Sequence, residues 1–474
     1  MPDGSATDLR NRAGAPILEI QRAAFLRHGA PDLAHRRAAL KRLKGAILGN
    51  RARLEAAAQE DFGVRSPIET DLIDIGPTIQ SINHMRANLG RWMKPRHRPT
   101  PMLMQPGKSV LHHQPVGIVG ILSAWNYPVA LALVPLATAL AAGNRVMLKT
   151  SELAPATADV LAEMLDGAFA PDEVATITGD AELAAAFTTL PFDHLFFTGS
   201  TDVGRRVMRA AAENLTPVTL ELGGKSPAIL CDDADFVLAA GDIAFGKTAN
   251  AGQTCIAPDY LLLPENRVPA FIEAFTAAIE RSFPGGLADP ALTTIASARH
   301  HARLNALLAD AAAKGAEIHP VLSAHEGAHP RAMAPTLVLN ATDDMLIMQE
   351  EIFGPLLPVL SIGSIEAAIE RVNRGSRPLA LYVYGKDRTA IDRVLAGTTS
   401  GNVTVNGTLL HYAVDTLPFG GVGDSGIGAY HGVEGFRRLS HAKGVFHPGR
   451  RHGARLLRPP YGSLAKLVRR LMLR

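Results

Sequence analysis

The hydrophobic pattern of the chain changes its period once, near residue 115. In residues 17–95, apolar positions recur at three- and four-residue spacing with charges between them, as in HRRAALKRLKGAILGNRARLEAAAQEDF. This period predicts helices. From residue 115, short apolar runs alternate with helical stretches: VGIVGILSA precedes a helix at 128–142, RVMLK precedes one at about 155–169, and HLFFTGS precedes VGRRVMRAAAEN. Strands that alternate with helices predict a parallel α/β sheet with right-handed crossovers.

A second series of the same kind begins at PVTLELGG. It continues through SPAILC, YLLLP, a helix at 268–282 and TSGNVTVNG. Between the helical start and the first series, residues 96–114 are rich in proline and basic residues, which is typical of a linker or an extended arm. The pattern therefore predicts two α/β domains with a break near 215–222.

Residues 114–144 carry no charge and could be mistaken for a membrane span. Asn126, Tyr127, Pro128 and Pro135 interrupt this run. Neither apolar half reaches the ~18 residues that a membrane-spanning helix needs. The run is better explained by a buried strand, a turn and a buried helix that starts at Pro128, because proline is favoured at the first helical position.

The composition indicates a globular protein of more than one domain. The 474 residues exceed the ~250–300 at which a single core stops growing, and 47% hydrophobic with 20% charged residues is typical of such proteins. The net charge of +3 gives no case for nucleic-acid binding. The two cysteines, Cys231 and Cys255, exclude a disulfide framework, and the first residues lack the apolar core of a signal peptide, so we expect a cytoplasmic protein.

The charge is distributed unevenly, with a basic carboxyl-terminal tail. Residues 450–474 contain eight Lys and Arg and no acid, which leaves a net charge of about −5 on the rest. Within 463–474, Leu464, Leu467 and Leu471 share one face of a predicted helix. Such a helix can make peripheral contact with an anionic membrane. We favour the alternative that it packs on its own body or a partner subunit, or frays, because one short helix binds lipid weakly.

Three motifs carry candidate chemistry, and each has a plain structural alternative. In HLFFTGSTDVGRRV, Gly199 ends a strand and Gly204 lies in the first turn of a helix, where phosphate can bind, but Thr201 breaks the G-x-G-x-x-G pattern. Glu221 lies on an apolar strand, either as an edge residue that faces solvent or as a buried general base of raised pKa. Cys255 is either packing or a nucleophile; it follows a polar Gly-Gln-Thr turn, where a thiol can be reached.

Other motifs are weaker. HEGAH at 325–329 matches the zinc pattern H-E-x-x-H, which requires a helix, but Gly327, Pro330 and Pro335 disfavour one. We therefore expect a solvated loop and no metal. GGKS at 223–226 lacks the earlier glycine of a phosphate-binding loop, so we expect a turn there.

The order of the motifs is more specific than any one of them. SAWNYP, LKTSELAP, FFTGSTDVG, LELGGKSP, NAGQTCIAP, EEIFGP and PFGGVGDSGIGAYHG follow one another within residues 115–440. This series resembles the NAD(P)-dependent aldehyde dehydrogenase superfamily. PFGGVGDSGIGAYHG and the later RPPYG resemble its class 3 branch, and EDFGVRSPIET, RWMKPRHRP and VTVNGTLLH resemble bacterial coniferyl aldehyde dehydrogenases within that branch.

The resemblance implies the fold and the division of the chain. The expected fold class is α/β and aldehyde dehydrogenase-like, with a Rossmann-type cofactor domain, a second α/β catalytic domain and a small bridging or oligomerisation element. The implied parts are an NAD-binding domain (1–95 and 115–218), a catalytic domain with the nucleophilic cysteine (219–400), bridging segments (96–114 and 401–448) and a basic amphipathic tail (449–474). The bridging segments imply a homodimer.

The resemblance also assigns roles to individual residues. Cys255 is the nucleophile, Glu221 is the general base, and Asn126 donates its side-chain amide to the oxyanion together with the Cys255 backbone N–H. The residues assigned to the cofactor are Trp125; Lys149 and Glu152 at the adenosine ribose; Gly199, Ser200 and Gly204 at the phosphates; Glu351 at the nicotinamide ribose; and Phe353 beside the nicotinamide.

The implied reaction is the oxidation of an aldehyde to the carboxylic acid through a thiohemiacetal and a thioester on Cys255. The expected substrate is an aromatic aldehyde such as coniferyl aldehyde, or a medium- to long-chain aliphatic one. NAD is the expected cofactor because Glu152 would repel a 2′-phosphate, with NADP as an alternative that class 3 members often accept. In VTVNGTLLH, Gly407 stands where coniferyl-type relatives commonly have Asp, which we expect to alter specificity.

Two other functions compete with this one. An acylating aldehyde dehydrogenase would pass the thioester to coenzyme A, and Glu221 argues against it because such enzymes do not need a water-activating carboxylate. A catalytically silent NAD-binding structural protein is disfavoured by the intact set of Cys255, Glu221 and Asn126.

Overall fold

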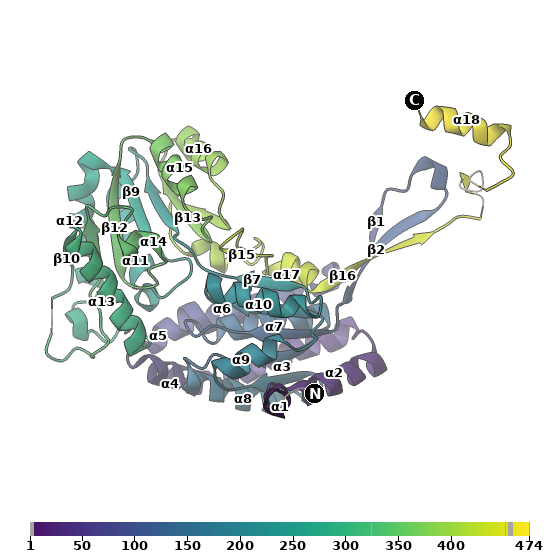
Figure 1. Ribbon diagram of the computed structural model, residues 1–474, viewed down its shortest axis with the longest axis horizontal. Coiled ribbons are helices and arrows are strands. Elements are labelled where there is room, and N and C mark those ends of the chain that lie inside the picture. Colours follow the sequence, from purple (N-terminus) through teal and green to yellow (C-terminus); the bar gives the residue numbers. More distant parts are fainter. Residues whose placement is uncertain (1–3, 324, 451, 454–457, 474) are drawn as a thin grey trace.

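The amino-terminal part of the chain is helical, as the spacing of its apolar residues predicts. The structure is a computed structural model that describes residues 4–323, 325–450, 452–453 and 458–473. Its first helices are α1 (Gly4–Arg12), α2 (Ala15–His28), α3 (Leu33–Gly49), α4 (Arg51–Phe62), α5 (Pro67–Thr70) and α6 (Gly76–Trp92), with a π-helical turn, η1 (Asp71–Ile75), before α6. Helix α2 packs directly on the first large sheet, whereas α3, α4 and α6 pack on helices that cover the other face of that sheet (Figure 1).

The first large sheet has six strands in the order β15-β7-β6-β3-β4-β5, and only β15 is antiparallel. The strands are β3 (Ile118–Leu122), β4 (Arg145–Lys149), β5 (Val174–Ile177), β6 (His194–Thr198), β7 (Val218–Glu221) and β15 (Gly426–Ile427). The helices that join its parallel strands are α7 (Ala130–Ala142), α8 (Pro155–Ala168), α9 (Ala181–Thr188) and α10 (Thr201–Ala212). Strand, helix and parallel strand repeat as in a Rossmann-type sheet.

The uncharged run at 114–144 forms β3 and α7, which confirms the interpretation as a buried strand and helix. Every residue of α7 is buried, because the helix lies between the sheet and α3, α6 and α17 (Gly432–Arg438). Among the described residues, the structure has no helix that combines the length and the apolar character required to cross a bilayer.

The second large sheet has seven strands in the order β10-β11-β12-β9-β8-β13-β14, and only β10 is antiparallel. The strands are β8 (Pro227–Leu230), β9 (Tyr260–Pro264), β10 (Glu317–Pro320), β11 (Thr336–Leu339), β12 (Leu356–Ile362), β13 (Ala380–Tyr384) and β14 (Asn402–Val405). The helices of this part are α11 (Phe236–Thr248), α12 (Val268–Ser282), α13 (Ala298–Ala313), α14 (Leu346–Gln349), α15 (Ile365–Arg374) and α16 (Arg388–Gly397). The fold is therefore α/β with two sheets, as expected from the sequence.

The placement of PVTLELGG at the start of the second series was wrong. Its strand, β7, pairs with β6 and β15 in the first sheet, with Glu221 beside Thr198 and Gly426. All four residues of β7 are buried. An apolar run buried on both faces fits either sheet, so only the pairing decides where the first series ends.

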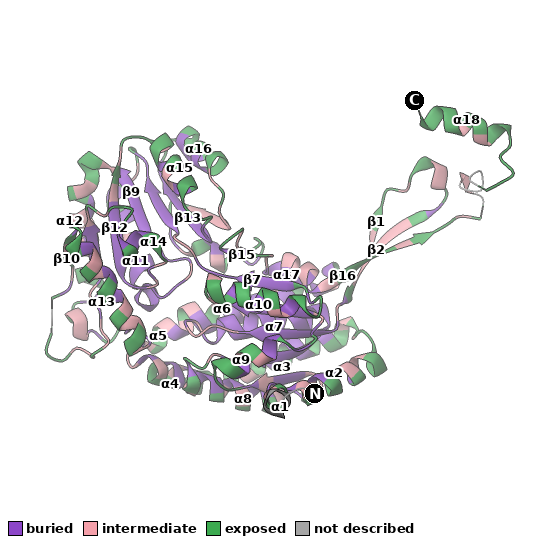
Figure 2. Ribbon diagram, viewed as in Figure 1, coloured by how far each residue is buried: buried purple, intermediate pink, exposed green. Residues whose placement is uncertain are grey.

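A third, small sheet forms an arm that projects from the body (Figure 1). It consists of β1 (Arg96–Arg98), β2 (Lys108–Pro115) and β16 (Ser440–His447), all antiparallel, and β16 follows α17 directly. Beyond the arm lies α18 (Ser463–Met472), which buries none of its residues (Figure 2). Leu464, Leu467 and Leu471 are exposed on it. The tail thus forms the expected amphipathic helix, but it does not pack on its own body.

Three fully buried histidines make the stability of this fold sensitive to acid. Burial lowers the pKa of His194 and of His431 to about 3 each, and that of His411 to about 4. In the unfolded chain a histidine titrates near 6.5. As the pH falls below about 6.5, these histidines therefore bind protons in the unfolded chain but not in the folded chain. The free energy of unfolding then decreases.

We predict that the unfolding temperature falls as the pH is lowered from 7.5 to 4.5, and that His411→Gln flattens this dependence. Differential scanning fluorimetry across the pH series measures both. His28→Gln, at an exposed histidine, is the matched control and should keep the wild-type slope. An equal slope in His411→Gln and wild type would contradict the assignment.

Candidate active site

The carboxyl edge of the first large sheet faces the amino edge of the second, and the region between these two edges is called the seam below. Residues that follow parallel strands of the first sheet lie at its carboxyl edge: Asn126 comes after β3, Gly199 after β6, and Glu221 ends β7. In the second sheet, Cys255 precedes β9 and Glu351 precedes β12, so both lie at its amino edge. The chain passes from β7 to β8 through residues 222–226 alone. This short connection brings the two edges together.

The loop that carries Cys255 is shaped by an unusual backbone. In the short helical turn η3 (Ala249–Gly252), Asn250 and Ala251 adopt left-handed conformations, with φ of 50° and 52°. Gly252 follows with φ of 69°, and a Cβ there would lie 2.4 Å from the backbone oxygen of Gly354. Only glycine fits so close a backbone approach. The turn therefore aims the next residues back toward β3.

The Gln253 carboxamide anchors this loop. Its Nε2 donates to the backbone oxygens of Asn250 at 3.0 Å and Thr294 at 3.1 Å, and its Oε1 accepts from the N–H of Ala296 at 2.8 Å. Asn126 joins the loop from the other side, because its Nδ2 donates to the backbone oxygen of Gln253 at 3.0 Å. One N–H of the Asn126 amide thus stays available two residues from the thiol.

Arg65 holds Asn126 and the cysteine loop in register. It is buried, and its Nη1 donates to the backbone oxygen of Asn126 at 3.0 Å and to Oδ1 of Asn250 at 3.2 Å. Its Nη2 lies 3.7 Å from Oδ2 of Asp74, which is also fully buried. Burial raises the pKa of Asp74 to about 6, although the Arg65 charge opposes this rise.

The sequence reasoning did not single out Arg65, Asp74, Asn250 or Gln253. Asp74 accepts from the N–H of Ala130 at 2.6 Å, at the start of α7. No sequence pattern marks Arg65, since its neighbours Val64 and Ser66 are only partly buried. Only the tertiary fold shows that its partners lie far along the chain.

Cys255 and Glu221 line one cavity of about 180 Å³. Most of its wall is apolar, and the apolar lining residues are Leu72, Ile73, Pro77, Leu131, Leu222, Phe245, Ile256, Leu379, Leu409, Leu410, Ala413 and Phe419. The same wall includes three tyrosines, Tyr127, Tyr412 and Tyr430. A thiol and a carboxyl group thus lie together in the wall of a mostly apolar cavity.

Burial disfavours the charged form of both reactive groups. Burial raises the pKa of Glu221 well above its ordinary value, and neither carboxyl oxygen has a hydrogen-bond partner within the described chain. Burial also raises the pKa of the Cys255 thiol, with further increases from Glu351 and Glu221. The backbone N–H groups of Cys255 and Ile256 act in the opposite direction, because they point toward the sulfur. Glu221 is therefore the buried carboxyl of raised pKa and not the solvent-facing alternative.

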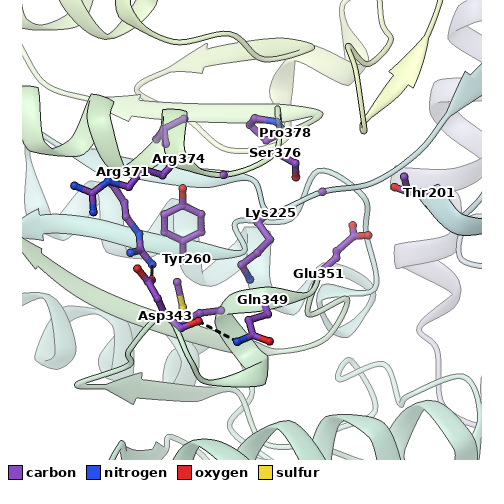
Figure 3. Close-up of a pocket in the computed structure, with 14 residues that line it drawn as sticks. Thr201, Lys225, Tyr260, Asp343, Gln349, Glu351, Arg371, Arg374, Ser376 and Pro378 are labelled. Atoms are coloured by element: carbon purple, nitrogen blue, oxygen red, sulfur yellow. Dashed lines mark hydrogen bonds and ion pairs between the residues drawn. The ribbon is translucent and has the colours of Figure 1, made fainter.

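Glu351 lies beside a second cavity of about 330 Å³ (Figure 3). Its carboxylate rests on Gly223, where a Cβ would come within 2.1 Å of Oε2, and it accepts a hydrogen bond from the backbone of Gly224. Burial, with a smaller contribution from Asp259, raises the pKa of Glu351 to about 8. Thr201, at the start of α10, lines the same cavity.

The loop around Glu351 is held by residues that the sequence reasoning missed. Lys225 donates to the backbone oxygens of Ile347 at 2.8 Å and Glu350 at 3.0 Å, and it pairs with Asp259. Arg303 pairs with Glu350 at 2.8 Å. GGKS thus lies in the irregular connection between β7 and β8, and its lysine has a structural partner.

Trp125 and Phe353 contact each other, with ring centroids 5.5 Å apart in an edge arrangement. Phe353 adopts a left-handed backbone, with φ of 50°. His300, a residue not foreseen, lies 5.0 Å from Trp125. These rings connect the loop after β3 to the loop before β12.

Lys149 and Glu152 form a pair at the carboxyl end of β4. The buried ammonium of Lys149 donates to the backbone oxygens of Thr150 and Gly179, both at 2.7 Å, and lies 4.0 Å from Oε2 of Glu152. Two of its three donors are thus used, and the third remains for Glu152 or a ligand. The carboxylate of Glu152 stays partly exposed.

The β6–α10 turn lies directly beside Glu221. The N–H of Gly199 donates to the Glu221 backbone oxygen at 3.0 Å, and Ser200 caps α10 by accepting from the N–H of Val203 at 3.4 Å. Gly204 is buried, and a Cβ there would come within 2.7 Å of Leu222. Gly204 therefore permits close packing of helix on strand.

The remaining motifs stay apart from this seam. HEGAH forms no helix over residues 325–329, so its two histidines do not share a helical face. Within the described ranges, the structure gathers no group of three metal-ligating side chains.

Comparison with known proteins agrees with these features. Residues 15–445 match the aldehyde dehydrogenase family. A Pseudomonas aeruginosa protein named "probable coniferyl aldehyde dehydrogenase" is 49% identical over 96% of this chain and 95% of its own length.

Solved structures agree as well. The structure titled as the substrate-bound state of Staphylococcus aureus AldH has a TM-score of 0.91 and 36% identity, over 96% of this chain and 99% of that one. A Mycobacterium tuberculosis aldehyde dehydrogenase complexed with NAD⁺ has a TM-score of 0.81 and 28% identity, over 90% and 88% of the two chains.

The charge of Glu351 contributes to the raised pKa of the Cys255 thiol, and this contribution can be tested through the reactivity of the thiol. Glu351→Gln should lower the pKa of Cys255 and accelerate its alkylation by iodoacetamide, about tenfold for each unit by which the pKa falls. The gain should be large at pH 9, where Glu351 is ionised, and small at pH 6.5, where it is already neutral.

Intact-protein mass spectrometry measures this alkylation. Glu350→Gln is the matched control, since Glu350 is exposed and paired with Arg303. Cys255→Ser reports the background from Cys231, whose pKa burial raises to about 11. Equal rates for Glu351→Gln and wild type at pH 9 would refute the proposed influence.

Proposed function

The chain belongs to the aldehyde dehydrogenase family, and from this premise we propose that it oxidises an aldehyde to the carboxylic acid through a thioester on Cys255. The observation that carries the proposal is that Cys255 and an unpartnered Glu221 line the same apolar cavity. An aldehyde carbon loses hydride only after a nucleophile has made it tetrahedral, and a thiol is suited to that attack. A carboxyl group of raised pKa is suited to accept a proton from water.

We propose NAD as the cofactor, with NADP as the alternative. The donor set fits such a dinucleotide. The first turn of α10 offers free N–H groups for phosphate, Lys149 and Glu152 can bind a ribose, and Glu351 lines a cavity that also contains Thr201. The carboxylate of Glu152 disfavours a 2′-phosphate by charge. When bound, the cofactor supplies the acceptor for the hydride that the substrate loses.

The residues of the chain perform the remaining steps. Cys255 attacks the carbonyl carbon as the thiolate, after its thiol has lost a proton to solvent, and the oxyanion receives hydrogen bonds from the backbone N–H of Cys255 and from the free N–H of the Asn126 amide. These donors are fixed in advance by Arg65 and Gln253, so they need little reorganisation when charge develops. Glu221 then takes a proton from water, and the resulting nucleophile cleaves the thioester to release the acid.

We propose an aromatic aldehyde such as coniferyl aldehyde as substrate, with a medium- or long-chain aliphatic aldehyde as the alternative. The apolar wall supports both, and the name of the Pseudomonas aeruginosa relative supports the first. A side chain at Gly407 would come within 2.8 Å of Leu410, which lines the cavity. The aspartate common in coniferyl-type relatives would thus press on this wall, so its absence supports an altered fit.

We predict that Cys255→Ala abolishes aldehyde-dependent NADH formation, with a loss on the order of 10⁴ or more, while NAD binding by calorimetry is retained. Glu221→Gln should slow hydrolysis by about 10²–10⁴ and let the acyl-enzyme accumulate. Absorbance at 340 nm and intact mass measure the two effects. A panel of cinnamyl, benzyl and long-chain aldehydes then ranks the substrates.

The same assay separates the competing functions. Adding coenzyme A should leave the free acid as the product. An acyl-coenzyme A product would instead favour the acylating reaction, and the absence of NADH with every aldehyde would favour the silent structural protein. Unchanged deacylation in Glu221→Gln would remove the role assigned to that residue.

We propose a second copy of the chain as the partner of the arm. The arm projects from the body of its own chain, and Met102 at its end is 91% exposed. Light scattering should give twice the 50.3 kDa chain mass, and Met102→Asp combined with Phe446→Asp should shift it toward the monomer. Leu215→Asp, at a residue 90% exposed on the body, is the matched control. A monomeric wild type would refute the dimer.

A further inference from the structure

Arg438, the last residue of α17, places its guanidinium on β7 beside the residues that precede Glu221. Its Nε donates to Oγ1 of Thr219 at 3.0 Å, and its Nη2 donates to the backbone oxygen of Val218. Thr219 and Glu221 are two residues apart on a strand, so their side chains emerge on the same face, about 7 Å apart. The positive charge thus lies on the face of β7 from which Glu221 enters the cavity.

The backbone at Gly428 leaves room for the Arg438 guanidinium to lie against β7. Gly428 has φ of 92°, and a Cβ there would lie 2.8 Å from Nε of Arg438. A larger residue at 428 would therefore push the guanidinium away from β7. Arg438 is half-buried, which lowers its pKa, and the carboxylate of Glu221 opposes this change.

Among the residues that the structure describes, the other groups around Glu221 add no positive charge. On β6, Nε2 of His194 lies 2.8 Å from Oγ1 of Thr219, and burial keeps that ring neutral by lowering its pKa to about 3. The hydroxyl of Thr219 thus has hydrogen-bond partners in both Arg438 and the ring of His194. The cysteine loop contributes the thiol of Cys255, and the loop before α17 contributes the phenol of Tyr430; burial raises the pKa of both.

We propose that Arg438 is a positioning residue for the water-activating step: it holds a permanent positive charge beneath Glu221 and so sets the pH range in which that carboxylate can act as a base. The proposal rests on the role of Glu221 given above. An arginine stays charged across the working range of an enzyme. It therefore stabilises the ionised carboxylate against the desolvation that burial imposes, and Arg438 is the charge that lowers the pKa of Glu221.

The test is the pH dependence of thioester hydrolysis in three variants. In Arg438→Gln, the fall of kcat on the acidic side of its pH profile should occur at a pH about one unit higher than in wild type. Acyl-enzyme should therefore accumulate at pH 7 and disappear at pH 9. Arg438→Lys keeps the charge but cannot make both hydrogen bonds, so its profile should return close to wild type. Arg437→Gln is the matched control, because Arg437 lies on the same helix and pairs with Glu434 at 2.7 Å.

An unchanged profile in Arg438→Gln, with only a lower unfolding temperature, would overturn the proposal and leave Arg438 a purely structural anchor. If Arg438→Gln does not fold, Thr219→Val removes one of the two hydrogen bonds that hold the guanidinium on β7 and should move the acidic side of the profile in the same direction, by a smaller amount. An unmoved profile again overturns the proposal. Glu221→Gln distinguishes failure of the proposed function from failure of the role proposed for Arg438. If that variant hydrolyses the thioester at the wild-type rate, the proposed function fails, whereas slow hydrolysis with unmoved Arg438 profiles refutes the role of Arg438 alone.

Discussion

The active-site seam depends on one buried ion pair, between Arg65 and Asp74. Asp74 accepts from the first turn of α7, and Arg65 reaches the backbone of Asn126 and the side chain of Asn250. Three segments distant in sequence are thereby fixed to one guanidinium. A buried pair gains little net stability over apolar packing, but removing one partner leaves a buried charge and costs about 3–5 kcal/mol. The pair is therefore best explained by the geometry that it imposes on the oxyanion donors.

A second constraint is the apolar lining of the cavity. Burial raises the pKa of Cys255 and of Glu221, because such a lining disfavours a charge on either group. A neutral thiol and a neutral carboxyl group can share a small space without repulsion. The charges that the reaction needs must then come from fixed donors and cations at the edge of the cavity. The N–H groups of Cys255 and Ile256 act on the sulfur, and Arg438 acts on Glu221.

Much of the fold could be predicted because local patterns are strong there. The uncharged run became β3 and α7, whose complete burial its composition requires. The strands around RVMLK and HLFFTGS appeared as expected. β7 was misassigned, because a short apolar run carries no mark of which sheet will bury it. The side chains that hold the loops, such as Gln253 and Lys225, were also missed, since a single polar residue has no periodic signal.

By itself the sequence determined the chemistry that is available: one thiol in a glycine turn, one carboxyl on an apolar strand, and an asparagine after the first strand of the series. Motif order then pointed to the family. Only the tertiary structure decided that Glu221 is buried with no hydrogen-bond partner among the described residues, that it shares a cavity with Cys255, and that Arg438 lies on its side of β7. The reason is physical. Residue identity fixes the intrinsic pKa and hydrogen-bonding capacity of a group, whereas burial and neighbouring charge depend on contacts between residues hundreds of positions apart.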